Sequence, residues 1–152
     1  MSQSLTKTYV HIVFSTKHRE PTIGDDVNES LYEYMGGICK SLESNPIKIG
    51  GYYDHIHILC VLSRKIALMK LVEDIKRGSS RWMKTKGDQY KNFYWQDGYG
   101  GFSVSPKDVD VVVNYIANQK AHHSKKENDF KTEYRKILNK CNVEFDERYV
   151  WD

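Results

Sequence analysis

The segment from His55 to Leu62 constrains the fold more than any other part of the sequence. It runs His-Ile-His-Ile-Leu-Cys-Val-Leu, and beyond its first residues both alternating sets of side chains are apolar. A strand without a polar face belongs in the interior of a sheet, where neighbouring elements cover it. The sequence therefore predicts a central strand here.

Further strands and helices can be assigned on either side of this segment. β-Branched and aromatic residues predict strands over 8–15 and 47–53, and short extended segments over 93–96 and 102–105. Apolar residues at helical spacing predict helices over 25–44, 66–83, 106–123 and 129–139. This order predicts an α+β fold of the ferredoxin-like (RRM-like) type, with an antiparallel sheet, helices packed on one face and extra C-terminal helices.

Length and composition limit the class of protein. The 152 residues contain no internal repeat or linker, so we expect a single domain over 1–152. A content of 39% hydrophobic and 28% charged residues excludes disordered and low-complexity classes. No apolar run approaches the roughly 18 residues that span a bilayer, and no apolar signal core is present, so we expect a cytoplasmic protein without a membrane partner. The spacing of Cys39, Cys60 and Cys141 predicts free thiols.

Two histidines on the predicted central strand form the first candidate site. His55 and His57 are two residues apart, so their imidazoles project from the same face of the strand. A pair of imidazoles on an apolar strand needs a partner such as a metal ion or an acid. Of these two partners, a metal ion is the more specific hypothesis, but two histidine ligands do not complete a metal site.

A second group of functional side chains lies on the predicted helix over 106–123. Tyr115, Gln119 and His122 are three and four residues apart, so one edge of this helix presents a phenol, an amide and an imidazole. The alternative is an interfacial tyrosine with polar neighbours.

Four segments together resemble a known family, the single-tyrosine HUH transposases of the insertion sequence 200/605 group and their REP-associated relatives. His55-Ile56-His57 is similar to the family's histidine pair, and Asn114-Tyr115-Ile116-Ala117-Asn118-Gln119 is similar to its nucleophile helix. The segments over 9–17 and 95–105 resemble the corresponding family segments as well. The resemblance covers nearly the whole chain.

This resemblance implies a specific chemistry. Tyr115 would attack single-stranded DNA at the ends of an insertion element and form a 5′-phosphotyrosine intermediate. His55, His57 and Gln119 would hold a divalent metal, which is Mg²⁺ or Mn²⁺ in the family. By their chemistry alone these ligands would equally accept Zn²⁺, Co²⁺ or Ni²⁺.

The charge distribution suggests where DNA phosphates bind. The net charge is only +3, but the stretch over 64–91 carries nine basic and three acidic residues. A solvated helix face is the alternative explanation for such a run. The family binds subterminal hairpins, and our candidates for their phosphate contacts are Lys76, Arg77, Arg81, Lys84 and Lys86. Trp82 and Tyr94 are candidates for base stacking or for core packing.

The resemblance also implies a homodimer in which the tyrosine helix of one subunit can complete the site of the other. Gly98, Gly100 and Gly101 precede this helix and are candidates for a hinge, because glycine allows large backbone rotations. The alternative is a tight turn between two strands.

Two other functions remain open at the level of the sequence. One is a host-domesticated relative that nicks repeated hairpins without moving its own gene. The other is a ferredoxin-like module that binds nucleic acid without catalysis.

Overall fold

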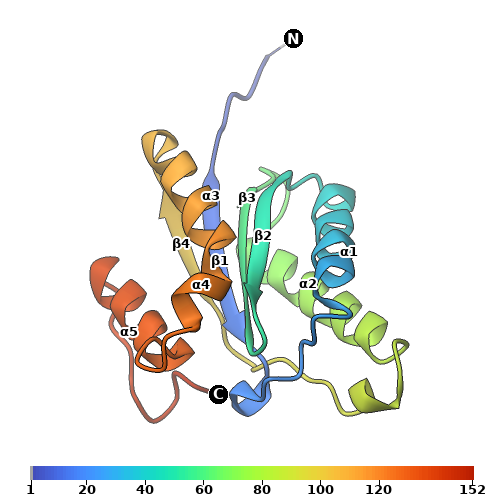
Figure 1. Cartoon of the computed structure of the whole chain (residues 1–152). Coiled ribbons are helices and arrows are strands. Elements are labelled where there is room, and N and C mark those ends of the chain that lie inside the picture. Colours follow the sequence, from blue (N-terminus) through green and yellow to red (C-terminus); the bar gives the residue numbers. More distant parts are fainter. Residues whose placement is uncertain (1) are drawn as a thin grey trace.

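The computed structural model describes residues 2–152 and contains a four-stranded antiparallel sheet between two layers of helices (Figure 1). The strand order is β2-β3-β1-β4, which is the ferredoxin-like arrangement. The strands are β1 (Tyr9–Ser15), β2 (Pro46–Tyr52), β3 (His55–Val61) and β4 (Gly100–Val104). The prediction of a central strand at His55 is therefore confirmed, because β3 lies between β2 and β1.

The register of β1 against β3 gives the two faces of the sheet different chemistry. Val13 pairs with His57 and Ser15 pairs with His55, so these side chains share one face. Ile12 pairs with Ile58 and points to the opposite face. The sheet thus has a fully apolar face and a face that carries the histidines.

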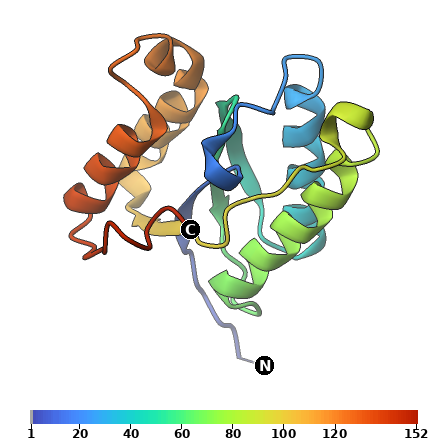
Figure 2. The same ribbon diagram turned by 90° about the horizontal axis from the view of Figure 1, so that it is seen from below.

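The apolar face is covered by α1 (Asn28–Ser41) and α2 (Leu68–Met83), as the ferredoxin-like pattern predicts (Figure 2). The side chains at this interface are fully buried and include Ile12, Phe14, Leu31, Met35, Ile58, Leu71 and Ile75. Burial of each such side chain contributes roughly 1.5–3 kcal/mol to folding, so this layer forms the main core.

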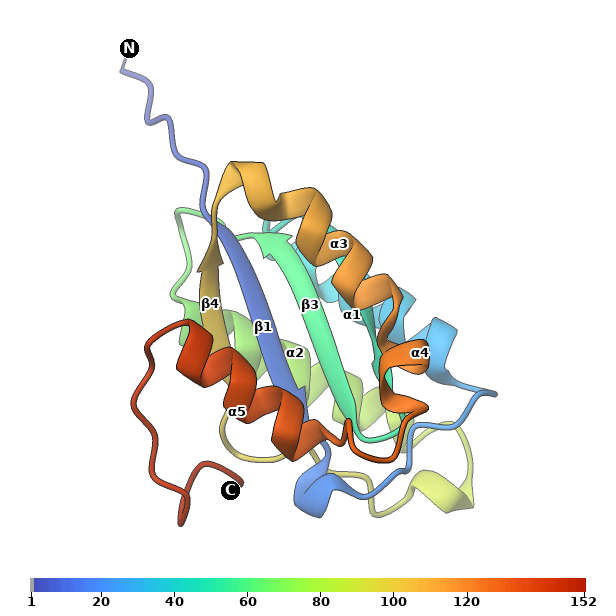
Figure 3. The ribbon, with the colours of Figure 1, turned by 60° about the vertical axis from the view of Figure 1, so that its left-hand side comes forward.

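The histidine face is covered by the C-terminal helices (Figure 3). These helices are α3 (Val109–Ala117), α4 (Gln119–His123) and α5 (Phe130–Lys140). A second, smaller core forms here from Val13, Phe102, Phe130, Tyr134 and Leu138. The extra helices therefore give the sheet a second layer, in addition to the layer predicted on one face.

The helix predicted over 106–123 is divided into three parts in the structure. A short 3-10 turn, η3 (Pro106–Asp108), leads into α3, and α3 ends at Asn118, whose φ of −98° and ψ of 16° depart from helical values. α4 begins directly after it. Two further 3-10 turns, η1 (Lys17–Arg19) and η2 (Asp88–Tyr90), lie in loops. Of the extended segment predicted over 93–96, only Trp95 makes a bridge, to Thr16.

The glycines before α3 that were predicted as a hinge lie in β4 or close to its start. Gly100 and Gly101 pair with Val13 and Ile12 inside β4, and the Gly98 N–H donates to the Asp152 carbonyl at 2.9 Å. A Cβ at Gly100 would stand 2.7 Å from the Tyr134 hydroxyl. Gly100 and Gly101 thus lie inside a paired strand, where their lack of a side chain serves the close packing of β4 against its neighbours, and the hinge stays a prediction.

Among residues 2–152, no helix combines the length and apolar character needed to cross a bilayer. Cys39 and Cys60 are buried and Cys141 is exposed, and all three are free thiols as predicted.

Replacing Gly100 with Ala should destabilise the protein, because the added methyl group overlaps Tyr134 and overpacking of this kind costs about 1–3 kcal/mol. The matched control is Gly37→Ala in α1, where an added Cβ meets nothing within 4 Å and should stabilise the helix by about 1 kcal/mol. Urea denaturation of both variants measures the two effects. Equal stability of the two variants would contradict the packing role of Gly100.

Candidate active site

His55 and His57 lie at the start of β3, fully buried beneath the C-terminal helices. The two rings are 5.1 Å apart between centroids. Their Nε2 atoms lie 3.3 Å and 3.2 Å from the same oxygen, Oε1 of Glu133. The spacing of two residues therefore does bring both imidazoles to one point.

The opposite nitrogen of each imidazole is also engaged. Nδ1 of His55 lies 2.7 Å from the Asp54 carboxylate, and Nδ1 of His57 lies 2.8 Å from Nε2 of His11. Such partners fix the orientation of a ring and are typical of histidines that bind metal. Asp54 and His11 thus hold both rings with Nε2 toward the centre of the site.

The surroundings raise the pKa of His55 and lower the pKa values of His11 and His57. Burial lowers the pKa of His55, but hydrogen bonds to Asp54 and Glu133 outweigh it and raise the pKa to about 9. Burial and the neighbouring His57 lower the pKa of His11 to about 3. Burial also lowers the pKa of His57. The carboxylates of Asp54 and Glu133 thus raise the pKa of His55, whereas burial lowers the pKa values of His11 and His57.

Tyr115 of α3 and Gln119, the first residue of α4, both reach this site. Oε1 of Gln119 lies 2.8 Å from Nε2 of His55, and Nε2 of Gln119 donates to Glu133 at 3.0 Å. The hydroxyl of Tyr115 donates to the other oxygen of Glu133, and its ring lies 5.6 Å from that of His57 between centroids. Burial and the Glu133 carboxylate raise the pKa of Tyr115, so the phenol is protonated at neutral pH.

Glu133, on α5, is the first of two residues of this site that the sequence did not predict. Its side chain is buried and contacts His55, His57, His123, Tyr115 and Gln119. Burial favours the neutral acid, but hydrogen bonds from the histidines outweigh it and hold the pKa of Glu133 well below its usual range. The sequence does contain one indication of this role. Glu133 lies on the same face of an amphipathic helix as the buried residues Phe130, Tyr134 and Leu138, where a charged side chain needs a partner.

His123 is the second residue that was missed. Its Nε2 lies 3.2 Å from Oε1 of Glu133, and its Nδ1 bonds the backbone carbonyl of Asn128. His122, which the sequence places on the same helix edge as Tyr115 and Gln119, lies 3.7 Å from Oε2 of the same carboxylate. Two adjacent imidazoles of α4 therefore complete the surroundings of Glu133.

The residues at this point fit a divalent metal ion. His55, His57 and Glu133 each offer one ligand atom, and these atoms all lie within 4.8 Å of one another. The amide oxygen of Gln119 adds a further oxygen donor beside His55. Carboxylate and amide oxygens suit Mg²⁺ and Mn²⁺, whereas imidazole nitrogens suit Zn²⁺, Cu²⁺, Fe²⁺ and Ni²⁺. The carboxylate of Glu133 therefore makes the set of ligand atoms more suitable for Mg²⁺ or Mn²⁺.

The basic residues of α2 lie in the layer on the other face of the sheet (Figure 2). Lys76 points inward, where its ammonium donates to the carbonyls of Gln96, Asp97 and Gly98 at 2.7, 3.1 and 2.6 Å. Burial lowers its pKa to about 8. Without DNA, the donors of Lys76 hold the loop before β4, and its phosphate contact stays a prediction.

The remaining basic candidates differ in their freedom to bind phosphate. Arg77 is paired with Glu73 at 3.0 Å and with Asp74. Arg81 is exposed, Lys84 donates to the Ser80 hydroxyl at 2.8 Å, and Lys86 lies 4.6 Å above the Trp82 ring. Within residues 2–152 no carboxylate pairs with these last three, so the free positive charge lies at the C-terminal end of α2.

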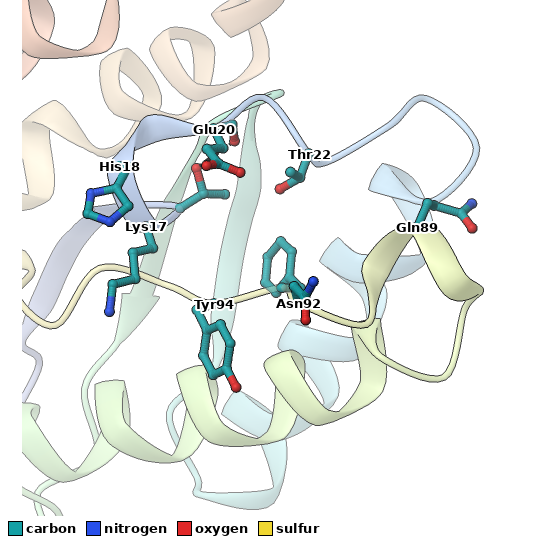
Figure 4. A pocket seen from close by; sticks show the side chains of 9 residues that line it. Lys17, His18, Glu20, Thr22, Gln89, Asn92 and Tyr94 are labelled. Carbon is teal, nitrogen blue, oxygen red and sulfur yellow. Dashed lines mark hydrogen bonds between the residues drawn. The ribbon is translucent and has the colours of Figure 1, made fainter.

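A separate cavity of about 440 Å³ lies between the segment after β1 and the segment that precedes β4 (Figure 4). Its lining is largely polar and includes Lys17, His18, Thr22, Asn92 and Tyr94. The Tyr94 side chain is 57% exposed and carries the Lys84 ammonium 4.2 Å from its ring centroid. Trp82 instead stacks on Tyr34, with centroids 5.3 Å apart. No residue of the histidine site lines this cavity.

Solved structures with the same fold include two transposases. A candidate transposase from Deinococcus radiodurans R1 is 21% identical with a TM-score of 0.61, over 78% of this chain and 98% of that one. A REP-associated tyrosine transposase bound to a REP hairpin is 16% identical with a TM-score of 0.57, over 81% of this chain and 74% of that one. At these identities the likeness shows the fold.

No curated protein sequence matches the chain. The family model described as "Transposase IS200 like" matches residues 4–119, a span that contains the histidine pair, Tyr115 and Gln119. Because this match covers well over half of the sequence, the chain belongs to the IS200-like transposase family.

Proposed function

We propose that this transposase cleaves and rejoins single-stranded DNA through a covalent bond to Tyr115. One observation carries the proposal: the Tyr115 phenol and the His55–His57 pair reach the same carboxylate, Glu133, within a single chain. A nucleophile and a set of metal ligands that converge on one point are what phosphoryl transfer requires. The family match over residues 4–119 supports the same conclusion.

In the proposed reaction the Tyr115 oxygen attacks a backbone phosphorus. A bond forms between the Tyr115 oxygen and the 5′-phosphate of the downstream fragment, and the bond from that phosphorus to the 3′ oxygen of the upstream fragment breaks. The phenol loses its proton and the 3′ oxygen gains one, so the step is balanced and leaves a free 3′-hydroxyl. A second 3′-hydroxyl can then attack the phosphotyrosine and rejoin strands without another energy source.

The protein side chains would prepare this attack in two ways. Glu133 accepts the hydrogen bond of the phenol and holds it toward the histidines. His55, His57, Gln119 and Glu133 would hold a divalent ion, for which we propose Mg²⁺ or Mn²⁺. Such an ion supplies Lewis-acid polarisation of a phosphate and neutralises charge that develops in the transition state.

The proposed substrate is single-stranded DNA with hairpins near the ends of an insertion element. The REP-associated neighbour was solved with a hairpin, which supports a hairpin partner for a chain of the same fold. The remaining candidates for hairpin phosphates are Arg81, at the C-terminal end of α2, and Lys84 and Lys86, just after it, because no carboxylate among residues 2–152 pairs with them.

Incubation with Mn²⁺ and single-stranded oligonucleotides from the DNA that flanks the gene should give a covalent protein–DNA adduct on a denaturing gel. Tyr115→Phe should abolish the adduct, because the nucleophilic oxygen is lost. The matched control is Tyr94→Phe, which removes an exposed phenol outside the site and should leave the adduct unchanged. An adduct that persists in Tyr115→Phe would exclude Tyr115 as the nucleophile.

Glu133→Gln should weaken Mn²⁺ binding by at least about tenfold, because an amide replaces the carboxylate at the centre of the ligand set. Isothermal titration calorimetry on the protein without DNA measures this affinity. Glu127→Gln removes an exposed carboxylate outside the site and serves as the control. Equal Mn²⁺ affinity of Glu133→Gln and the unchanged protein would show that Glu133 is not a ligand.

The structure brings Tyr115 to the histidines of its own chain, so exchange of the tyrosine helix between subunits is not needed to assemble the site. A homodimer stays a prediction from the family resemblance. Mixing Tyr115→Phe with His55→Ala/His57→Ala protein distinguishes the two arrangements. We expect no recovery of adduct in the mixture, and recovery would show that subunits share active sites.

A further inference from the structure

A groove lined by residues of α3 and α5 leads from the surface to the tyrosine. Figure 3 shows these two helices on the same face of the sheet. It has a volume of about 300 Å³. Val111 and Val112 of α3 form one wall, and Ile137 of α5 lies in the other. Tyr115 and Glu133 line the same groove, so it opens directly onto the proposed nucleophile.

Two lysines of α5 line this groove. Lys136 and Lys140 are both exposed and lie four residues apart on one helix, which places their Cβ atoms roughly 6 Å from each other. Within residues 2–152 no carboxylate lies in ion-pair range of either ammonium, whereas Arg135 of the same helix is paired with Glu147 at 2.6 Å. The groove therefore carries two positive charges that the protein itself does not neutralise.

The α5 wall lies outside the segment that matches the family. The family match ends at Gln119, while Lys136 and Lys140 belong to Phe130–Lys140. The same helix supplies Glu133 to the site. α5 thus contributes the Glu133 carboxylate, which contacts Tyr115, and two lysines that line the groove beside it.

We propose that this α3–α5 groove holds the DNA strand next to the phosphate under attack, with Lys136 and Lys140 bound to two of its other phosphates. This inference rests on the proposed function, because it takes the ligand from the chemistry of Tyr115. Lysine ammonium groups bind phosphates as point charges, and the aliphatic walls provide surface for sugars and bases.

The dimensions of the groove select a single strand. Its volume is at the lower end of the range for small-molecule sites, roughly 300–1,000 Å³. A double helix does not enter a cavity of that size, whereas one strand with unstacked bases does. The apolar lining from Val111, Val112 and Ile137 also suits bases that have left a stack better than a hydrated duplex backbone.

The test measures binding of a fluorescein-labelled single-stranded 20-mer of random sequence in EDTA over a range of salt concentrations. Each phosphate contact on a single strand contributes about 0.7 to the slope of log K against log salt. Lys136→Ala/Lys140→Ala should therefore reduce the slope by about 1.4. Lys125→Ala/Lys126→Ala, an exposed pair between α4 and α5, removes the same charge and should leave the slope unchanged.

A slope that is the same in Lys136→Ala/Lys140→Ala as in the unchanged protein overturns the inference, as does an equal reduction in the control pair. Absence of any strand binding by the unchanged protein overturns it as well. Lys136→Gln/Lys140→Gln keeps more of each side chain and should show the same loss, which separates charge from folding. Because binding is measured without divalent ions, failure of the groove is distinct from failure of the proposed function, which appears as a missing Tyr115-dependent adduct.

Discussion

The position of the C-terminal helices over the sheet depends on the hydrogen bonds and ion pairs of one buried carboxylate, that of Glu133. A charged group beneath a layer of helices is costly unless charges and hydrogen bonds compensate it. Here the compensating groups come from β3, α3 and α4, namely His55, His57, Tyr115, Gln119 and His123. The C-terminal helices are therefore fixed over the sheet by a polar network as well as by the small core around Phe130.

The network around Glu133 forms on only one face of the sheet, because the two faces carry different side chains. The alternation of β1 and β3 sends Ile12 and Ile58 to the main core and His11 and His57 to the other face. Gly50 of β2 lets α3 approach closely, because a Cβ there would stand 3.0 Å from the Ile116 carbonyl. The main core and the candidate site thus lie on opposite faces of one sheet, and the residues of the site are carried by helices and strands.

Much of the site was predictable because its members are close in sequence or lie on regular elements. The period of a strand places His55 and His57 together, and the helical spacing brings Gln119 one turn after Tyr115. The strand order followed from the succession of patterns along the chain. The division of the helix at Asn118 was not predicted, because no glycine or proline marks it in the sequence.

The sequence by itself determined the ferredoxin-like sheet, the histidine pair and the phenol, since local periodicity decides which face each side chain occupies. Only the tertiary structure decided that Glu133 lies at the centre, that His11 supports His57, that Lys76 faces inward and that Gly100 is a packing site. These roles arise between elements far apart in the chain, and the packing of one layer on another sets their distances. Periodicity within a segment carries no information about such distances.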